Sequence, residues 1–518
     1  MKLNLFKSDI EKRFVLSYLL FLLIPLTLKG QDNRILVNQD IVYEYISRLQ
    51  QRGFLIDLNP TSQPYTFREV SESINTTESN KLSELEKKWI TFIKKRLGRV
   101  SKEFGIEANT TTYLSDTKRL NTLEPLNRRY HIFAAPNFAA YTEHQNFIVQ
   151  GGLTHNFYYD QDPDGLDASR RLYIRSEDTY LGYQNSNIKA YLGRFSNNWS
   201  YTGTSSTLLS NHAYSFDQFN LSFKGKYISF QSILGELDGL NENGTFNGQA
   251  FRPGSIKRYI SLRKLDWRIK KNFQLSYFES VIYTGEQAGL SLKYLTPLHM
   301  LAFVTDNNPK NEDVNLFVGT MFWWNFQKTT VTGQLMLDDM HFLDNKEVTT
   351  FSSMLTFNLT DLVQNTDIGM EIEAVAYQTY NAPDAEERYL YLGKGIATRN
   401  TDYVLGKIYS KIYLDEHVNG LTITPSLTYY LQGEQTINQP IVRNNPDGSL
   451  IDIILTGEVE KTLRAGINIF YNPHPNFWFE LNTGYNKVDN YMNVNGAANN
   501  RFSTIAKIGF RFGLYHSN

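Results

Sequence analysis

Acidic residues near the ends of two alternating segments are the first side chains in this sequence that suggest chemistry. Asp338 and Asp339 are neighbours, and Glu279 lies in a different segment. Carboxylates brought together at a rim could accept hydrogen bonds from sugar hydroxyls, or hold Ca²⁺ through oxygen ligands. The alternative is structural, with these acids setting the charge of an inner surface and anchoring loops.

Aromatic and basic residues form a second candidate set. Their rings offer flat apolar faces on which a sugar ring could stack, and guanidinium groups pair well with the carboxylates of acidic sugars. In the alternative interpretation the rings belong to aromatic girdles and the arginines to structural ion pairs. The set comprises Trp199, Tyr201, Trp323, Arg194, Arg258 and Arg263.

Catalytic motifs do not accompany these groups. Gly-x-Ser-x-Gly, His-Glu-x-x-His and phosphate-loop patterns are missing, and the nine histidines are scattered along the chain. The absence of cysteine excludes disulfides and thiolate metal sites. We therefore expect no enzyme, no cofactor and no metal, with a hydrolase assembled from Ser and His across strands as the weaker alternative.

The elements that would position these residues are strands with a two-residue period. Between positions 462 and 471 apolar residues alternate with polar ones, so that Leu463 and Arg464 face opposite ways. Residues 477–485 repeat the pattern after a short turn. Alternation over about ten residues with aromatic residues near the ends is typical of transmembrane β-strands.

The same pattern predicts eighteen strands, an even number, as in bacterial single-chain barrels. The predicted fold is thus mainly β, an antiparallel transmembrane β-barrel of about eighteen strands with a small N-terminal α-helical bundle. The strands are expected at 107–115, 129–140, 146–159, 171–183, 187–195, 216–224, 227–237, 257–267, 271–283, 314–326, 330–338, 349–359, 367–379, 403–415, 420–433, 451–471, 477–487 and 503–514.

The connections between these strands alternate in length. Joints such as 268–270 and 327–329 are short, whereas 196–215, 284–313 and 380–402 are long. Outer-membrane barrels have short periplasmic turns and longer external loops. The sorting predicts long loops on the cell exterior, with Asp338 and Asp339 on their side. A large soluble β-sandwich has no reason to sort its loops in this way.

The first thirty residues predict a signal peptide. A basic start is followed by an apolar run from Val15 to Leu28, and Gly30 is a plausible cleavage position. An uncleaved transmembrane anchor is the alternative, but the run is shorter than the roughly 18–20 residues that a span needs.

Residues 35–103 do not alternate and instead predict three amphipathic helices. Asp40 is expected to cap a helix that runs to Arg52, and Thr66 to Glu69 forms a capping box. A third helix carries Trp89 on its apolar face. We expect a signal peptide at 1–30, a periplasmic helical bundle at 31–105 that rests on the barrel mouth, and an outer-membrane barrel at 106–518.

Overall composition agrees with a barrel. Aromatic residues make up 14% of the 518 residues, and the formal net charge of −1 gives no reason to expect nucleic acid as a partner. The mean hydropathy of −0.40 is too polar for a helical membrane protein, yet normal for a barrel with a wet inner face.

Several segments resemble the Wzi capsule-assembly family of outer-membrane proteins, and together they span most of the mature chain. The final His516-Ser517-Asn518 departs from the aromatic residue on which such barrels usually end, which leaves the last strand boundary open. The segments are 45–53 with 64–66 in the opening helices, 258–263 and 275–283 in mid-barrel strands, and 334–339 at an acidic strand end.

The resemblance implies a non-enzymatic, lectin-like protein that binds capsular or exported polysaccharide and retains it at the cell surface. It implies an outer-membrane location in contact with lipid, and we expect a monomer. A saccharide-selective porin or channel is the alternative, and it would need an open lumen. The residues expected to bind polysaccharide are Asp338, Asp339, Glu279, Arg263, Arg258, Arg194 and Trp199.

Overall fold

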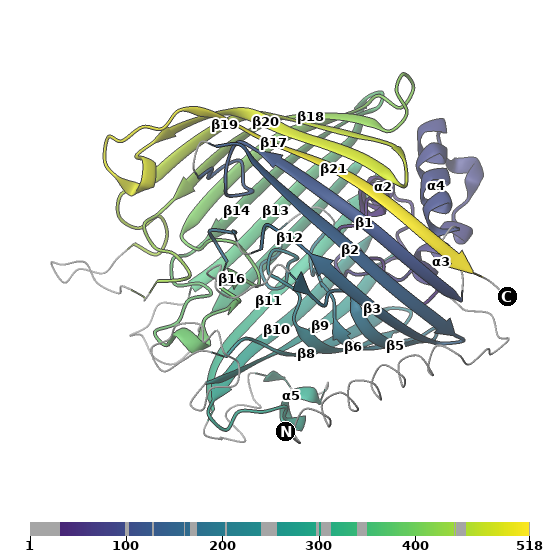
Figure 1. Cartoon of the computed structure of the whole chain (residues 1–518), viewed down its shortest axis with the longest axis horizontal. Coiled ribbons are helices and arrows are strands. Elements are labelled where there is room, and N and C mark those ends of the chain that lie inside the picture. Colours follow the sequence, from purple (N-terminus) through teal and green to yellow (C-terminus); the bar gives the residue numbers. More distant parts are fainter. Residues whose placement is uncertain are drawn as a thin grey trace, which may run out of the picture.

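Antiparallel pairing closes the sheet of this protein on itself in the computed structural model (Figure 1). The sheet has nineteen strands; eighteen form the ring, and the two-residue β4 only extends it beside β3. The predicted barrel and its strand number are therefore confirmed. The structure describes residues 32–98, 103–126, 129–159, 161–165, 174–201, 205–239, 256–296, 300–301, 312–338, 350–439, 441 and 452–516.

The first half of the ring runs from β1 to β10. Its strands are β1 Phe104–Ser115, β2 His131–His144, β3 Phe147–His155, β5 Thr179–Gln184, β6 Ile188–Arg194, β7 Asp217–Lys224, β8 Ile228–Glu236, β9 Lys257–Lys270 and β10 Phe273–Gly285, with β4 at Ile174–Arg175.

The second half runs from β11 to β21, and β21 pairs with β1 to close the ring. Its strands are β11 Asp313–Phe326, β12 Thr329–Asp338, β13 Thr350–Val363, β14 Thr366–Val375, β17 Tyr403–Tyr413, β18 Leu421–Gln432, β19 Glu460–His474, β20 Phe477–Asp489 and β21 Arg501–His516. A separate short hairpin, β15 Leu390–Tyr391 and β16 Lys394–Gly395, lies in a long loop.

The alternation seen in the sequence sorts side chains onto the two faces of this wall. In β19 the outward Leu463 is 41% exposed, whereas Arg464 is 4% exposed and faces the lumen. An ionised group on a lipid-facing wall would cost roughly 2–4 kcal/mol at mid-bilayer, so charges belong inside.

Two predicted strands are too long at their starts. Residues 452–459 precede β19 as loop, because Thr456 is held by the Asp402 carboxylate and Leu455 and Gly457 have positive φ angles. The strand expected at 171–183 is regular only from Thr179, in β5. The predicted signal peptide and Asp339 lie outside the described residues.

The long loops and the short turns lie at opposite ends of the barrel, as Figure 1 shows with the C-terminus and three helices at the short-turn end. These helices are α2 Val42–Gln51, α3 Phe67–Thr76 and α4 Glu84–Leu97, and a single turn, α5 Leu292–Leu295, belongs to a long loop. None of the helices in the described part of the chain is long and apolar enough to cross a membrane.

Capping boxes open two of the three helices, and the sequence predicted the first of them. The predicted capping box of Thr66 and Glu69 opens α3, and a second one, Ser83 with Glu86, opens α4. The prediction that Asp40 caps α2 was wrong, because the N-cap is Ile41 and no side chain caps the helix. Asp40 accepts a hydrogen bond from the Val42 N–H, and its other oxygen is taken by two arginines.

Candidate functional site

The N-terminal segment closes the lumen at the short-turn end. Tyr45 of α2 donates a hydrogen bond to Asn472 at the end of β19, and Arg48 donates to Thr422 of β18. Asn325 of β11 in turn donates to the carbonyl of Gln51 at 2.8 Å. Helix α2 is thus attached to three strands of the ring, β11, β18 and β19, inside the wall.

Arg52, just after α2, makes the strongest of these attachments. Its guanidinium lies 2.7 Å from Asp367 and 3.0 Å from Asp361, beside the short turn between β13 and β14, and it also faces Glu86 of α4 at 3.7 Å. Its carbon centre lies 4.9 Å from the ring centre of Trp89. Burial alone would lower the pKa of Arg52, but Asp367, Tyr413 and Asp361 together outweigh burial and raise that pKa, so the charge persists.

The long loop between β6 and β7 enters the lumen from the other end. Asn198 and Gln63 exchange two backbone hydrogen bonds of 2.9 and 3.0 Å, and Tyr201 donates to the Ser47 carbonyl in α2. Thr207 donates its N–H to Gln334 of β12 at 3.0 Å. The loop therefore crosses the barrel interior and meets the N-terminal segment, so the lumen is obstructed from both ends.

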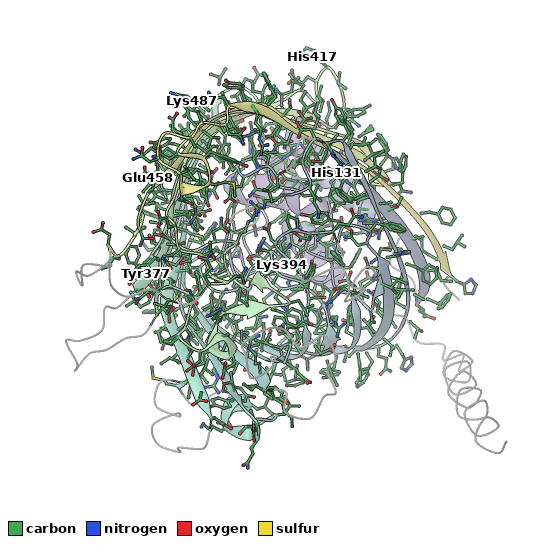
Figure 2. The ribbon with its side chains drawn as sticks, turned by 60° about the vertical axis from the view of Figure 1, so that its left-hand side comes forward. His131, Tyr377, Lys394, His417, Glu458 and Lys487 are labelled. Carbon is green, nitrogen blue, oxygen red and sulfur yellow. The ribbon has the colours of Figure 1, made fainter. Side chains whose placement is uncertain are left out.

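Three long loops meet above this point. Lys394 forms an ion pair of 2.7 Å with Asp162, and Arg399 pairs with Asp164 at 2.5 Å. Ser210 donates to the Ala397 carbonyl at 2.6 Å. Figure 2 shows Lys394 near the middle of the ring, while Glu458 and Lys487 lie at its rim. These contacts form a roof over the lumen, built from residues 156–159, 161–165, 205–215 and 376–402.

Arg258 holds the largest of these loops from the barrel wall. Its guanidinium donates to the carbonyls of Glu386, Arg388 and Leu390 at 2.6, 2.5 and 3.1 Å, and it lies 3.3 Å from Asp238. The side chain is almost fully buried. Arg258 thus shapes the loop through its backbone and does not face solvent.

Glu279, Arg263 and Asp338 have similar positions. Glu279 pairs with Arg263 at 3.7 Å and accepts the Leu301 N–H at 2.9 Å, while Arg263 donates to the Tyr294 carbonyl. Asp338 accepts the Tyr380 N–H at 2.7 Å. All three are buried and anchor long loops, which is the structural alternative that the sequence left open.

The remaining predicted residues divide in the same way. Trp199 is fully buried in the inward loop, with the ammonium of Lys264 over its ring at 5.6 Å. Arg194 is partly exposed and pairs with Asp217 at 2.5 Å. The described residues of the predicted set therefore do not converge on one exposed site, and their role in polysaccharide binding stays a prediction.

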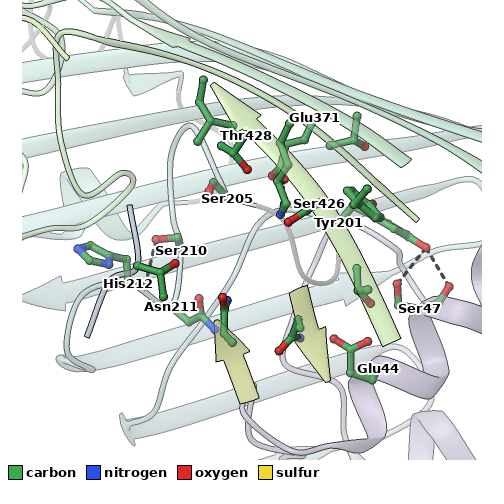
Figure 3. A pocket seen from close by; sticks show the side chains of 18 of the residues that line it. Glu44, Ser47, Tyr201, Ser205, Ser210, Asn211, His212, Glu371, Ser426 and Thr428 are labelled. Atoms are coloured by element: carbon green, nitrogen blue, oxygen red, sulfur yellow. Dashed lines mark hydrogen bonds and ion pairs between the residues drawn. The ribbon is translucent and has the colours of Figure 1, made fainter. Parts of the chain in front are cut away.

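A cavity of about 950 Å³ remains inside the barrel between α2 and the roof (Figure 3). Figure 3 shows Glu44 and Ser47 on the helix side, Ser205 and Ser210 on the inward loop, and Glu371 on the wall. Its size lies at the upper end of ordinary ligand pockets. Amide side chains are numerous in its lining: Asn38, Gln39, Gln51, Gln63, Asn121, Asn198, Asn211, Asn358, Asn400, Asn468 and Asn482.

Charged residues in this cavity occur mostly as pairs. Lys411 lies 3.6 Å from Glu44, and Lys407 lies 3.3 Å from Glu371. Lys411 lowers the pKa of Glu44, so its carboxylate stays ionised at neutral pH. Burial, with Lys394 and Arg399 nearby, holds the pKa of His212 well below its usual value, so this imidazole is neutral.

Metal binding finds no support among the described residues. In that part of the chain no group of three or more His, Asp or Glu side chains is arranged to hold a metal ion.

Sequence comparison gives the family. Residues 131–501 match the family model described as capsule assembly protein Wzi, which covers more than half of the chain. The chain belongs to this family. No curated protein matches it by sequence.

Comparison with solved structures gives the same fold. Wzi of Escherichia coli is described as an outer-membrane protein involved in group 1 capsule assembly and as a carbohydrate-binding β-barrel. Its superposition on this protein has a TM-score of 0.64 and 12% sequence identity. The match covers 93% of this chain and 100% of the Escherichia coli chain. OccK3 (OpdO) of Pseudomonas aeruginosa has a TM-score of 0.45 at 10% identity, over 80% and 97% of the two chains.

Sequence reasoning missed two features of this Wzi family member. No local signal in residues 196–215 distinguishes a loop that enters the lumen from one that faces solvent. The arginines that hold the helices lie far in sequence from their partners; Arg52 and Asp367, for example, are separated by 315 residues.

Proposed function

We propose that this protein binds capsular or exported polysaccharide at the outer membrane and retains it at the cell surface, without catalysing a reaction. The observation that carries the proposal is the obstructed lumen. The N-terminal segment and the loop between β6 and β7 hydrogen-bond to each other inside the barrel through Gln63 and Asn198. A saccharide channel would need an open lumen at the level of Gln63 and Asn198.

Membership of the Wzi family supports the assignment to capsule assembly. The carbohydrate binding described for the Escherichia coli Wzi, which shares the fold, supports polysaccharide as the ligand. The apolar outer wall, with residues such as Leu463 and Phe512 exposed, supports a lipid environment.

In the proposed orientation the long loops face outward and the helices face the periplasm, bracing the barrel as a bundle within residues 31–105. This follows the usual arrangement of short periplasmic turns and long external loops. We propose that the roof and the loop surface above it contact the polymer, and that the protein acts as a monomer.

The predicted residues then act in two ways. Arg258, Arg263, Glu279, Asp338 and Trp199 serve binding by holding the loops in shape, since their side chains are buried. Arg194 is partly exposed and available for direct contact with an acidic sugar. Asp339, next to the anchored Asp338, belongs to the same proposed rim.

Weak contacts suffice for such a function. A polymer engages many copies of a surface protein at once, and the second and later binding events are intramolecular. Affinity per site can therefore be low while retention on the cell remains strong.

Binding and conduction are separated by two measurements on the purified protein. We expect the strain's own polysaccharide, immobilised on a sensor surface, to bind the protein, and we expect no steady current when the protein is inserted in a planar bilayer. Steady porin-like conductance without polysaccharide binding would overturn the proposal in favour of a saccharide channel.

A further inference from the structure

Three arginines meet two carboxylates where the helices join the first and last strands. Arg96 of α4 lies 2.9 Å from Asp40 and 3.0 Å from Glu107 of β1. Arg34 lies 2.6 Å from Glu107, and Arg511 of β21 lies 3.0 Å from Asp40. We refer to these five residues as the seam cluster. All five side chains are at most 7% exposed.

The seam cluster carries one positive charge more than it can neutralise, since three guanidinium groups face two carboxylates. Arginine cannot lose its proton in a protein, so this charge cannot be removed by titration. An unbalanced charge in a buried site is costly unless it is paired.

The two carboxylates are already shared among several donors. Glu107 accepts from Arg34, Arg96 and the Tyr515 hydroxyl. Asp40 accepts from Arg96 and Arg511 on one oxygen and from the Val42 N–H on the other.

Three nitrogen donors of the cluster are left over. Nη1 of Arg34 and both Nε and Nη1 of Arg511 are buried and have no acceptor among the described residues. The Arg511 guanidinium lies 5.7 Å from the ring centre of Trp478. This cation–π interaction is favourable, but the indole ring offers no acceptor atom. Donors on a cation that are left without an acceptor in a buried site destabilise the folded state.

A small cavity lies beside these donors. Its volume is about 20 Å³, and Arg34, Arg96 and Arg511 all line it together with Asp40 and Glu107. A site needs about 10–15 Å³ on this measure to hold one water molecule. The cavity therefore has room for at least one water-sized species.

Other acids nearby supply the missing charge only in part. Asp178 also lines the cavity but makes no ion pair within the described residues. Burial, reinforced by Glu177, raises the pKa of Asp178 to about 7, so this carboxyl is partly protonated at neutral pH. Glu143 accepts the backbone N–H groups of Asn33 and Arg34, and not a guanidinium.

We propose that the seam cluster binds one small monovalent inorganic anion, of the chloride class, between Arg34 and Arg511. The anion accepts the three leftover N–H groups and neutralises the extra charge. It thereby joins the N-terminal segment, which carries Arg34, to the last strand of the barrel. The site is independent of polysaccharide binding, because it lies at the short-turn end.

The first test is the midpoint of thermal unfolding of the full chain in detergent. Sodium bromide or chloride replaces sodium gluconate at constant ionic strength, because gluconate is too large for the cavity. A bound anion stabilises the folded state by RT ln(1 + [L]/Kd), so the midpoint should rise and its dependence on bromide should follow that form.

Variants separate this site from general salt effects. Arg511→Gln removes the extra charge, and the response to bromide should vanish. Asp178→Asn removes a carboxylate whose negative charge would compete with the anion. The bromide concentration that gives half of the rise in the unfolding midpoint should therefore be lower than in the wild type. Arg52→Gln is the matched control: Arg52 also joins helix to barrel but faces three carboxylates, so this variant should lower the midpoint and keep the bromide response.

Bromide also reports directly by anomalous scattering. Crystals grown in bromide should show an anomalous peak at hydrogen-bond distance from Arg34 and Arg511. Water alone in the cavity, together with an equal salt response in the wild type, Arg511→Gln and Asp178→Asn, would overturn the proposal. Should Arg511→Gln not fold, Asp178→Asn and the diffraction experiment still decide it.

Discussion

The two ends of this barrel are closed by different kinds of contact. At the short-turn end, guanidinium groups of the N-terminal segment meet carboxylates of the wall, as Arg52 meets Asp367 and Arg34 meets Glu107. At the loop end, the wall donates to loop backbone, as Arg258 does to three carbonyls. The first kind needs particular side chains on both partners, whereas the contacts from wall to loop backbone leave the side chains at the held loop positions unspecified. Side chains at the loop end are specified only where loops pair with each other, as Lys394 does with Asp162.

This difference shows how one fold can keep a fixed base and a variable surface. A loop that is held through its carbonyls can change its sequence and keep its path, since every residue has a carbonyl. Side-chain pairs at the helix end cannot change singly without leaving a buried charge unpaired. In this protein the proposed polysaccharide surface stands on the end that can vary.

The largest expected effect follows from removing Glu107, the acceptor shared by Arg34 and Arg96. Glu107→Ala leaves two buried cations short of a partner, and we expect a loss of about 3–5 kcal/mol in the free energy of unfolding. Thermal unfolding in detergent measures it. Glu84→Ala, on the exposed face of α4, should leave the midpoint unchanged; an equal drop in both variants would contradict the account.

Arg258→Met should act on the loop end alone. It keeps the length of the side chain but removes the donors to Glu386, Arg388 and Leu390, at a local cost of about 1–3 kcal/mol. We expect faster cleavage by protease within 376–402 and weaker polysaccharide binding, with the midpoint of barrel unfolding nearly unchanged. Unaltered protease resistance would show that Arg258 does not hold this loop.

Acid should loosen the contacts of Asp40 at the helix end. Burial acts to raise the pKa of Asp40, but Arg511 and Arg96 outweigh it, and the pKa lies below its usual value. Asp40 therefore stabilises the fold fully above about pH 4, the unfolded value, and this stabilisation is lost as pH falls through the lowered pKa. The fluorescence of Trp89, which packs against Tyr413, should change in this range.

The control for this titration is Asp40→Asn, which cannot change its charge. Its acid transition should be weaker than that of the wild type. An identical transition in both proteins would assign the effect to other carboxylates, such as Glu69. The pKa of Glu69 is also lowered, because Lys189, Lys224 and the Thr66 N–H together outweigh its burial.

The smallest effect on stability is expected at the partly exposed Arg194. Its partner Asp217 is 61% exposed, and pairs of this kind contribute about 0.2–1 kcal/mol. Arg194→Ala should therefore leave unfolding almost unchanged while lowering affinity for an acidic polysaccharide. If affinity also stays the same at low salt, Arg194 is not a polysaccharide contact.

The barrel could be predicted from the sequence because its period is local. Alternation around Leu463 and Arg464 is visible within a few residues, and it is imposed directly by the two faces of the wall. The capping box of Thr66 and Glu69 is equally local. The start of β19 was misplaced because residues 452–459 are held by the distant Asp402, which no short window contains.

For the candidate site, the sequence could predict the types of residue but not their arrangement. Alternation placed Arg258 and Glu279 on inward faces near the long loops, but it carries no information on whether a loop folds over them. Their burial depends on the path of residues 376–402 and on Leu301. The seam cluster is less predictable still, because Arg34 and Arg511 come together only when the ring closes.

The fraction of polysaccharide that stays attached to cells tests the central claim most directly. It is measured by comparing cell-bound and released polysaccharide in a strain lacking the gene and in the same strain carrying the wild-type gene. The account predicts that deletion shifts polysaccharide into the medium with total production unchanged, and that the wild-type gene restores attachment. An unchanged attached fraction after deletion would contradict it.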